Sequence, residues 1–443
     1  MALNRLERPE DYLGKTFDCV CGRQHTIPVE QLIYAPDAVE RLPLVCASLL
    51  DERKALVLAD QRTWEVIGQD VLVALSNAGW NAAEHVIEDE YGHGPACDDL
   101  THDRLEAVLP PVGLIVAVGS GVINDLSKWI AFTRQIPYVV MATAASMNGY
   151  AAANVAPAIA GVKTLVRAAP PRAIFAVPGV IEQAPVELTT AGLGDILAKP
   201  VSTGDWLLNH HLLEEYFCPL CSEIFTSVES VYLEAPEKIR EQDPQAIEAL
   251  FRASVYSGFA MTMVGTSAPA SGGEHLLSHT LDMMSGVDGR PHDLHGRQVG
   301  LGTIFASAIY EHLLKQESFT AHPSPEAIDR TFWGPIANAV QQQYVNKQPR
   351  LQQIAKQLSS PDAWDRLREI LAPRLITPGA IKRTLQLAGG ATTAPQIGCD
   401  RQRLRTALLH QHEIRRRPTV IDLAWLCGIL PQAVDELVDH WLT

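Results

Sequence analysis

Three histidines and one aspartate have the residue types and spacing of a divalent metal site. His275 and His279 stand four residues apart, on one face of a predicted helix, and His295 follows twenty residues after His275. Asp195 lies in an otherwise apolar, glycine-rich helix start. Two histidines from neighbouring helices and one carboxylate leave an open coordination position, as catalytic zinc, nickel or iron needs. Asp195 could instead serve only as a partner of the helix dipole.

A second group of residues suits a phosphate ligand. The apolar segment Leu114–Val118 ends in Gly119, Ser120 and Gly121 and runs into a predicted helix. Backbone N–H groups and the positive end of the helix dipole favour a pyrophosphate there, and glycine lets the backbone approach it. Asp60 ends an earlier strand, where a carboxylate can bind an adenosine ribose and favour NAD over NADP. The glycine segment does not match the GxGxxG pattern of dinucleotide-binding proteins, so it could instead be a plain turn. Asp60 could likewise be an exposed loop aspartate with no ligand.

Cysteines and one histidine form a third group. Cys19, Cys21 and His25 fall within one short segment, and Cys218 and Cys221 form a CxxC. Three or four of these residues could hold a structural zinc if the fold brings them together. The interpretation we favour is a short amino-terminal hairpin with small buried thiols.

Composition restricts the kind of protein that carries these groups. The 443 residues suit two or three domains, and 47% hydrophobic with 20% charged residues is typical of globular chains. A net charge of −15 argues against a broad surface for nucleic acid or anionic lipid. The charged amino terminus lacks the apolar stretch of a secretory signal, and no run approaches the roughly 20 apolar residues of a membrane span. We expect a soluble, cytoplasmic protein with no nucleic-acid partner.

The first 185 residues alternate short apolar runs with helical patterns. This alternation is typical of a parallel sheet built from βα units. A helix is expected over Thr63–Ala78. The sequence therefore predicts an α/β dinucleotide-binding domain over residues 1–185. Its expected strands are Ala55–Ala59, His85–Ile87, Leu114–Val118, Tyr138–Met141 and Ala173–Val177.

Residues 186–443 show apolar positions at three- and four-residue spacing. This spacing predicts an all-α domain, with helices over Val186–Trp206, Ala246–Met263 and Gly273–Met284. Arg415–Arg417 is interpreted as a solvated helix end. Breaks between helices are expected at Pro219, Pro244, Pro323, Pro361 and Pro373.

The motifs, taken in order, identify a family. They are Gly119–Lys128 (GSGVINDLSK), Thr143–Tyr150 (TAASMNGY), Gly194-Asp195 with Lys199, Glu274-His275 with His279, and Leu294–Gly296, together with the amino-terminal CxCGxxH. In this order they resemble the sn-glycerol-1-phosphate dehydrogenases, particularly the bacterial, metal-dependent branch. That family is grouped with glycerol dehydrogenase, iron-containing alcohol dehydrogenases and dehydroquinate synthase. The resemblance implies a dehydroquinate synthase-like fold, with an amino-terminal dinucleotide domain and a helical carboxyl-terminal domain.

The resemblance also implies roles for individual residues. Asp195, His275 and His295 would bind one divalent metal (Zn, Ni or Fe), and Asp195 would also contact the substrate. His279 would face the substrate and the proton path as the catalytic residue. NAD(H) or NADP(H) would lie against Asp60, Gly119, Ser120, Gly121, Val122, Ile123, Thr143, Ala144, Ala145 and Ser146.

Three positions depart from the family pattern. Asn148 stands where the family has a substrate-binding aspartate, and Ala152 stands where a serine usually contacts the cofactor. Arg297 replaces the common glutamate after His-Gly. These changes move the local charge toward cationic, so we expect Asn148, Lys199 and Arg297 to favour an anionic substrate. Lys199 is equally consistent with a solvated surface group.

The expected reaction is the reduction of a small phosphorylated carbonyl compound by NAD(P)H. The family reaction interconverts dihydroxyacetone phosphate and sn-glycerol 1-phosphate. A phosphonate or another anionic carbonyl is the alternative substrate that Asn148 suggests. A dehydroquinate synthase-like carbocyclase uses the same fold, although its first metal ligand is usually glutamate. We expect the chain to form a homodimer.

Overall fold

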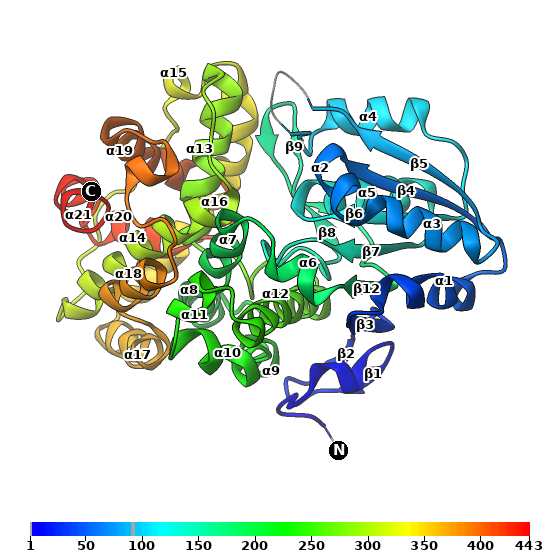
Figure 1. The fold of residues 1–443 in the computed structure, drawn as a ribbon. Coiled ribbons are helices and arrows are strands. Elements are labelled where there is room, and N and C mark those ends of the chain that lie inside the picture. Colours follow the sequence, from blue (N-terminus) through cyan, green and yellow to red (C-terminus); the bar gives the residue numbers. More distant parts are fainter. Residues whose placement is uncertain (1, 90–93) are drawn as a thin grey trace. The chain divides into compact units, whose positions relative to one another are not determined.

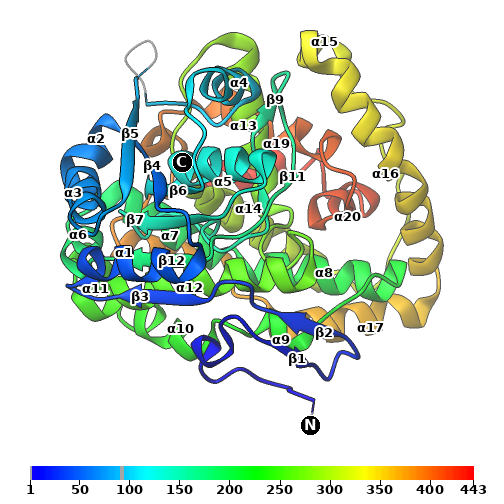
Figure 2. The same cartoon turned by 90° about the vertical axis from the view of Figure 1, so that its right-hand side faces the viewer.

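The computed structural model describes residues 2–89 and 94–443. The chain forms two compact units that interleave along the sequence. The first unit comprises residues 1–159, 164–192 and 219–266, and the second comprises residues 160–163, 193–218 and 267–443. Figures 1 and 2 show the elements of both units. The domain boundary near residue 185 stays a prediction. The two units are defined by which segments pack together, and this does not test which segments fold independently.

A six-stranded parallel sheet organises the first unit. The strand order is β3-β12-β7-β6-β4-β5. β6 (Leu114–Gly119) and β7 (Tyr138–Ala142) are buried along their whole length, as expected for central parallel strands covered on both faces. The remaining strands are β3 (Gln31–Tyr34), β12 (Ala173–Ala176), β4 (Lys54–Asp60) and β5 (Asn81–Ile87).

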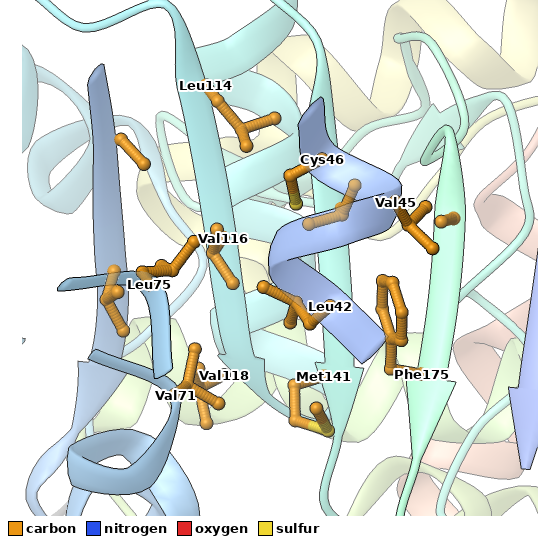
Figure 3. Close-up of a cluster of buried hydrophobic side chains, with 14 of the residues drawn as sticks. Leu42, Val45, Cys46, Val71, Leu75, Leu114, Val116, Val118, Met141 and Phe175 are labelled. Atoms are coloured by element: carbon orange, nitrogen blue, oxygen red, sulfur yellow. The ribbon is translucent and has the colours of Figure 1, made fainter. Parts of the chain in front are cut away.

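Helices cover both faces of this sheet. α5 (Gly121–Arg134) lies against β4, β6 and β7 (Figure 1). On the opposite face, Leu42 and Cys46 of α1 point toward Val116, Met141 and Phe175 of the sheet (Figure 3). The helices of this layer arrangement are α1 (Ala38–Leu49), α2 (Gln61–Thr63), the π-helical turn Trp64–Gly68, α3 (Gln69–Asn77), α4 (Asp99–Val108) and α6 (Pro178–Glu182).

The first unit also holds elements outside the sheet. A 3-10 turn (Pro9–Tyr12) precedes an antiparallel hairpin of β1 (Thr16–Asp18) and β2 (Gln24–Thr26), and β8 (Asn154–Val155) pairs with β11 (Val166–Arg167). β9 spans Ala158–Ile159. Four helices from the segment predicted for the helical domain pack here. They are α9 (Pro219–Ser222), α10 (Thr226–Leu233), α11 (Glu237–Arg240) and α12 (Pro244–Val264).

The second unit is helical apart from β10 (Val162–Lys163) among the residues described. α7 (Val186–Leu197) begins in the first unit and ends in the second. The other helices are α8 (Lys199–Leu213), α13 (Glu274–Asp288), α14 (His295–Lys315), α15 (Arg330–Trp333), α16 (Ala337–Leu358), α17 (Pro361–Leu371), α18 (Pro378–Leu387), α19 (Arg401–His410), α20 (Val420–Leu426) and α21 (Val434–Trp441). Short 3-10 turns cover Gly334–Ile336, Ala372–Arg374, Ala394–Ile397 and Gln411–Glu413.

The predicted fold class, a parallel α/β sheet followed by helices, is confirmed. β5 begins four residues before the predicted His85–Ile87. β3 was not predicted, because a four-residue edge strand carries too little apolar pattern to stand out. Within the described residues, no helix has both the length and the apolar character that crossing a membrane would require.

Candidate metal and cofactor site

Asp195 approaches the start of α14 because Gly194 lets the backbones of the two helices touch. A Cβ atom on Gly194 would lie 2.1 Å from the carbonyl oxygen of Gly296. Only glycine permits such contact between α7 and α14. Asp195 and His295 are the sequence neighbours of these two glycines. The small-residue contact therefore sets how closely the aspartate and the histidine approach each other.

The two histidines of the metal site come from helices that are also in close contact. His275 lies in the first turn of α13, and His295 is the first residue of α14. A Cβ atom on Gly302 of α14 would lie 2.1 Å from the carbonyl oxygen of Glu274. This backbone contact fixes the spacing of α13 and α14, so the two imidazoles meet with ring centroids 5.1 Å apart.

Asp195, His275 and His295 form a compact group of donor atoms. Nε2 of His275 lies 3.2 Å from Oδ1 of Asp195, and one donor atom from each residue lies within 4.8 Å of the others. One carboxylate and two imidazoles suit zinc, nickel or ferrous iron, and three protein ligands leave a position open for substrate. The donor set thus fits the divalent metal that the sequence predicts.

Both histidines are oriented by hydrogen bonds at their other ring nitrogen. Nδ1 of His275 donates to Oε1 of Glu274 over 2.8 Å, because a carboxylate can only accept. Nδ1 of His295 lies 2.8 Å from the hydroxyl oxygen of Ser278. The bond to the Glu274 carboxylate fixes the tautomer of His275 with Nε2 free for a metal, and the bond to the Ser278 hydroxyl orients the ring of His295. Neither orienting bond was predicted from the sequence, although Glu274 stands directly beside a predicted ligand.

The charge of Asp195 is favoured by its neighbours. Burial alone would raise the pKa of this carboxyl, but its interaction with His275 and the positive charge of Lys199 outweigh burial and lower the pKa. Lys199 is 1% exposed, and its ammonium donates to the carbonyl oxygen of Ala270 over 3.2 Å. Lys199 is therefore a buried counter-charge beside the aspartate and not a solvated surface group.

His279 lies beside the donor group without joining it. Its ring centroid is 6.0 Å from that of His275 and 5.7 Å from that of His295, with which it stacks. Burial, followed by the charge of Arg415 and the other two histidines, lowers the pKa of His279 well below its ordinary value. The imidazole is therefore neutral near pH 7, the form that can accept a proton.

A buried acidic network supports the start of α13. Oε1 of Glu274 accepts from the backbone N–H of Gly272, and Oδ2 of Asp205 accepts from that of Gly273, each over 2.6 Å. Burial and the nearby Glu274 raise the pKa of Asp205 to about 7. Tyr310 donates to the other oxygen of Asp205 over 2.6 Å. These bonds hold the turn that carries His275.

Arg415 and Arg417 complete this network, so their interpretation as a solvated helix end is wrong. Arg415 donates to the carbonyl oxygens of Ser271 and Gly272 over 3.1 Å each, and Arg417 donates to that of Ser271. Both guanidinium groups are held against the turn before α13. The sequence pattern missed this role because the partners lie more than a hundred residues away.

Arg297 is engaged with other groups of the second unit. Its Nε donates to Oδ2 of Asp293 over 2.7 Å, and its Nη2 donates to the carbonyl oxygen of Gln396 over 2.5 Å. These bonds neutralise much of the extra positive charge that the sequence placed next to His295. A direct role of Arg297 in binding substrate stays a prediction that this geometry does not favour.

A different cation lies near the histidines. Lys163 of β10 lies 3.5 Å from Oδ2 of Asp282, whose other oxygen is 3.1 Å from Nδ1 of His292. Burial is the largest cause of the lowered pKa of His279 and of His295, and the charge of Lys163 adds to it in both cases. Lys163 lies outside every sequence motif and was not predicted as a site residue.

The predicted dinucleotide-binding residues lie at or just after the carboxyl ends of β4, β6 and β7. β4 and β6 are parallel neighbours, and from this pair the chain continues to β5 on one side and to β7 on the other. Asp60 ends β4 and Gly119 ends β6, so these residues flank the point where the strand order reverses. Open α/β sheets bind nucleotides at such a point.

The start of α5 has the form that a phosphate site requires. A Cβ atom on Gly119 would lie 2.7 Å from that of Ile123, so the tight entry into the helix needs glycine. Over Gly121 no described atom lies within 4 Å of such a Cβ. The hydroxyl of Ser120 makes no hydrogen bond to the first turn. Backbone N–H groups of this turn, including Val122 and Ile123, suit an anion.

Asp60 has a structural role in addition to its predicted one. Oδ1 of Asp60 accepts from the backbone N–H of Thr63 over 2.8 Å and caps α2. Its other oxygen lies 3.2 Å from Nη2 of Arg62. Ribose binding by Asp60 stays a prediction, since a cap bond and an ion pair already occupy the carboxylate.

The segment after β7 is packed tightly. Ala144, Ala145 and Ala152 are buried, and Tyr150 donates to the carbonyl oxygen of Ala144 over 2.8 Å. Thr143 and Ser146 are each 8% exposed. The alanine side chains therefore contribute packing, and any contact with a cofactor would come from backbone or from Thr143 and Ser146.

Asn148 lies on a loop that a buried lysine fixes. The ammonium of Lys128 donates to the carbonyl oxygens of Gly149 and Asn154 over 2.7 Å and 3.1 Å, and lies 3.4 Å from Oδ1 of Asp125. Burial lowers the pKa of Lys128. Asp125 and Lys128 are thus structural, and they hold the half-buried Asn148 in a defined place.

Comparison with known proteins agrees with these features. A model of the family described as iron-containing alcohol dehydrogenase matches residues 33–185. Glycerol-1-phosphate dehydrogenase [NAD(P)+] of Halalkalibacterium halodurans is 32% identical over 318 residues, which cover 70% of this chain and 78% of that relative. The chain belongs to the glycerol-1-phosphate dehydrogenase family.

The likeness to this family extends over nearly the whole chain. Glycerol-1-phosphate dehydrogenase [NAD(P)+] of Geobacillus stearothermophilus is 29% identical over 417 residues, 92% of this chain and 95% of that relative. The crystal structure of glycerol dehydrogenase from Schizosaccharomyces pombe has the same fold, with a TM-score of 0.60 at 15% identity, covering 93% of this chain and 91% of that one. The resemblance predicted from the motifs is confirmed. The chain is an NAD(P)-dependent, metal-containing alcohol dehydrogenase by family.

Proposed function

We propose that this member of the glycerol-1-phosphate dehydrogenase family interconverts dihydroxyacetone phosphate and sn-glycerol 1-phosphate with NAD(H) or NADP(H). The observation that carries the proposal is the convergence of Asp195, His275 and His295, with donor atoms within 4.8 Å of one another. Relatives that cover most of the chain are named for this activity. A cytoplasmic location and a homodimer are parts of the same proposal.

The residues around the metal site have distinct tasks in this reaction. Asp195, His275 and His295 would hold the ion, which when bound supplies Lewis acidity toward a substrate oxygen. Glu274 keeps His275 in the tautomer that presents Nε2, and Ser278 holds the orientation of the His295 ring.

Proton transfer is assigned to His279. Its lowered pKa keeps the ring neutral near pH 7, so Nε2 or Nδ1 can take the proton released when an alcohol is oxidised. In the reverse direction the same ring returns that proton. A nicotinamide cofactor supplies or accepts the hydride.

The test of this function is a substrate panel. The chain is reconstituted separately with zinc, nickel and ferrous iron, and each form is assayed with NADH and NADPH. The carbonyl substrates are dihydroxyacetone phosphate, dihydroxyacetone and phosphonoacetaldehyde. Stoichiometric NAD(P)H oxidation with dihydroxyacetone phosphate supports the proposal. Activity with none of these substrates would contradict the dehydrogenase proposal and favour the carbocyclase alternative.

A second candidate substrate class follows from Asn148. A carboxylate accepts two hydrogen bonds from substrate hydroxyls, whereas an amide accepts and donates. A phosphonate or another anionic carbonyl compound that lacks a second hydroxyl would bind equally well with Asn148 in place of the family's aspartate. The preferred substrate in the panel distinguishes this candidate from the first.

Replacing Asn148 with aspartate tests its role in substrate choice. We expect Asn148→Asp to lower the KM for dihydroxyacetone phosphate about tenfold, because one charge-assisted hydrogen bond to a hydroxyl contributes roughly 1.5 kcal/mol. The KM for phosphonoacetaldehyde should not fall. The measurement is steady-state kinetics with both substrates, and exposed Asn346→Asp serves as the control. An unchanged ratio of the two KM values would show that Asn148 does not select the substrate.

A further inference from the structure

Two cysteines and a histidine converge at the amino-terminal hairpin. β1 and β2 pair with Phe17 opposite His25, and the connecting turn carries Cys19 and Cys21. The backbone N–H of Cys19 donates to the carbonyl oxygen of Arg23, and that of Gly22 donates to Cys19, each over 3.0 Å. Gly22 has a φ of +82°, which glycine adopts without strain. This tight turn folds both thiols back toward the imidazole.

A third cysteine reaches the same place from a distant part of the sequence. β2 and α9 both pack against α12, and the two views place them near each other (Figures 1 and 2). Cys218 directly precedes Pro219, the first residue of α9, where the chain re-enters the first unit. Its position is therefore set by the peptide bond to that helix. Cys221, the second cysteine of the CxxC, lies outside the group.

Together the four side chains offer a complete set of soft donors. Cys19, Cys21, His25 and Cys218 each supply one atom, and all four atoms lie within 4.8 Å of one another. Cys19, His25 and Cys218 are at most 4% exposed. Three thiols and one imidazole match the Cys₃His set of structural zinc sites.

The orientation of His25 agrees with a metal ligand. Nδ1 donates to the carbonyl oxygen of Met263, at the end of α12, over 3.1 Å. Nε2 then carries the lone pair, and it lies 3.4 Å from Sγ of Cys21. Zinc bonds of about 2.3 Å to sulfur and 2.0–2.1 Å to nitrogen imply about 3.6 Å between two ligands of one tetrahedral ion. The separation observed is close to that value.

We propose that Cys19, Cys21, His25 and Cys218 bind a structural zinc ion, separate from the catalytic metal. Four protein ligands close the coordination sphere, so the ion has no open position for substrate. Its role is to join the amino-terminal hairpin to α12 and the start of α9. The hairpin agrees with the interpretation favoured from the sequence, whereas the zinc is the alternative that the sequence analysis left open.

Metal content of the full-length chain tests the proposal. We expect two metal equivalents per chain by plasma mass spectrometry. Asp195→Asn should lose one of them and keep zinc, whereas Cys21→Ser should lose the zinc and keep the other. Cys221→Ser is the matched control, because it alters a buried thiol of the same CxxC and should retain both. These readouts do not depend on which substrate the enzyme turns over, so failure of the proposed function would leave them valid.

Cobalt replacement identifies the ligands independently of the variants' stability. The wild-type chain refolded with Co²⁺ should show thiolate-to-cobalt charge transfer, which the carboxylate and imidazole ligands of the other site cannot produce. The band should persist in Asp195→Asn and disappear in Cys21→Ser. One metal equivalent in the wild type together with no charge-transfer band would overturn the proposal. A Cys21→Ser chain that keeps both metals and the band would also overturn it.

Discussion

Asp195→Asn should reduce kcat/KM at least about a thousandfold and remove the catalytic metal. The amide keeps the shape of the side chain but loses the charge that binds a cation. Loss of Lewis-acid stabilisation worth several kcal/mol corresponds to a rate loss of this size. Metal content, measured after dialysis, should fall by one equivalent per chain. The two measurements together test whether Asp195 is a ligand.

Stability has to be separated from catalysis in this experiment. Asp195 is buried beside the buried Lys199, and removing one partner of a buried pair costs roughly 3–5 kcal/mol. Asp422→Asn is a matched control, because Asp422 is equally buried and accepts from the buried Lys347 over 2.9 Å. We expect the free energy of unfolding of Asp422→Asn, measured in urea, to fall by a similar amount, while this variant keeps its metal. Full metal content and activity within tenfold of wild type in Asp195→Asn would exclude Asp195 as a ligand.

The sheet was predictable because its central strands are buried on both faces. β4, β6 and β7 appear in the sequence as continuous apolar runs that end in Asp60, Gly119 and Thr143. The helical character of the remaining chain was predictable from its apolar residues, which recur every three or four positions. Periodicity cannot tell which body a helix packs against, so the place of α9–α12 in the unit of the sheet was not foreseen.

The candidate metal ligands were predictable from residue type, but the groups that orient them were not. Asp195, His275 and His295 have side chains that bind metals. Ser278 and Arg415 act through hydrogen bonds whose partners are fixed only by tertiary structure. A lysine such as Lys199 gives no sign in the sequence of whether it is solvated or buried, because its aliphatic stem suits both.

The contact between α7 and α14 leads to a prediction about metal affinity. Gly194→Ala would place a Cβ atom 2.1 Å from the carbonyl oxygen of Gly296, which is a backbone atom and cannot turn aside as a flexible side chain would. The helices must therefore separate, which moves Asp195 away from His295. We expect a stability loss of about 1–3 kcal/mol, as overpacking usually costs, and metal binding weaker by about 10–100-fold.

Gly286→Ala provides the comparison for this effect. Gly286 also lies in a helix of the second unit, α13, but the nearest atom to an added Cβ there is 4.0 Å away. Alanine should leave metal affinity unchanged and raise stability by up to about 1 kcal/mol, since it favours helix more than glycine does. Urea unfolding and competition with a metal chelator measure both quantities. If Gly194→Ala binds metal as tightly as Gly286→Ala, the helix contact does not set the spacing of the ligands, and the site must tolerate a shift of α7 through movement of the side chains alone.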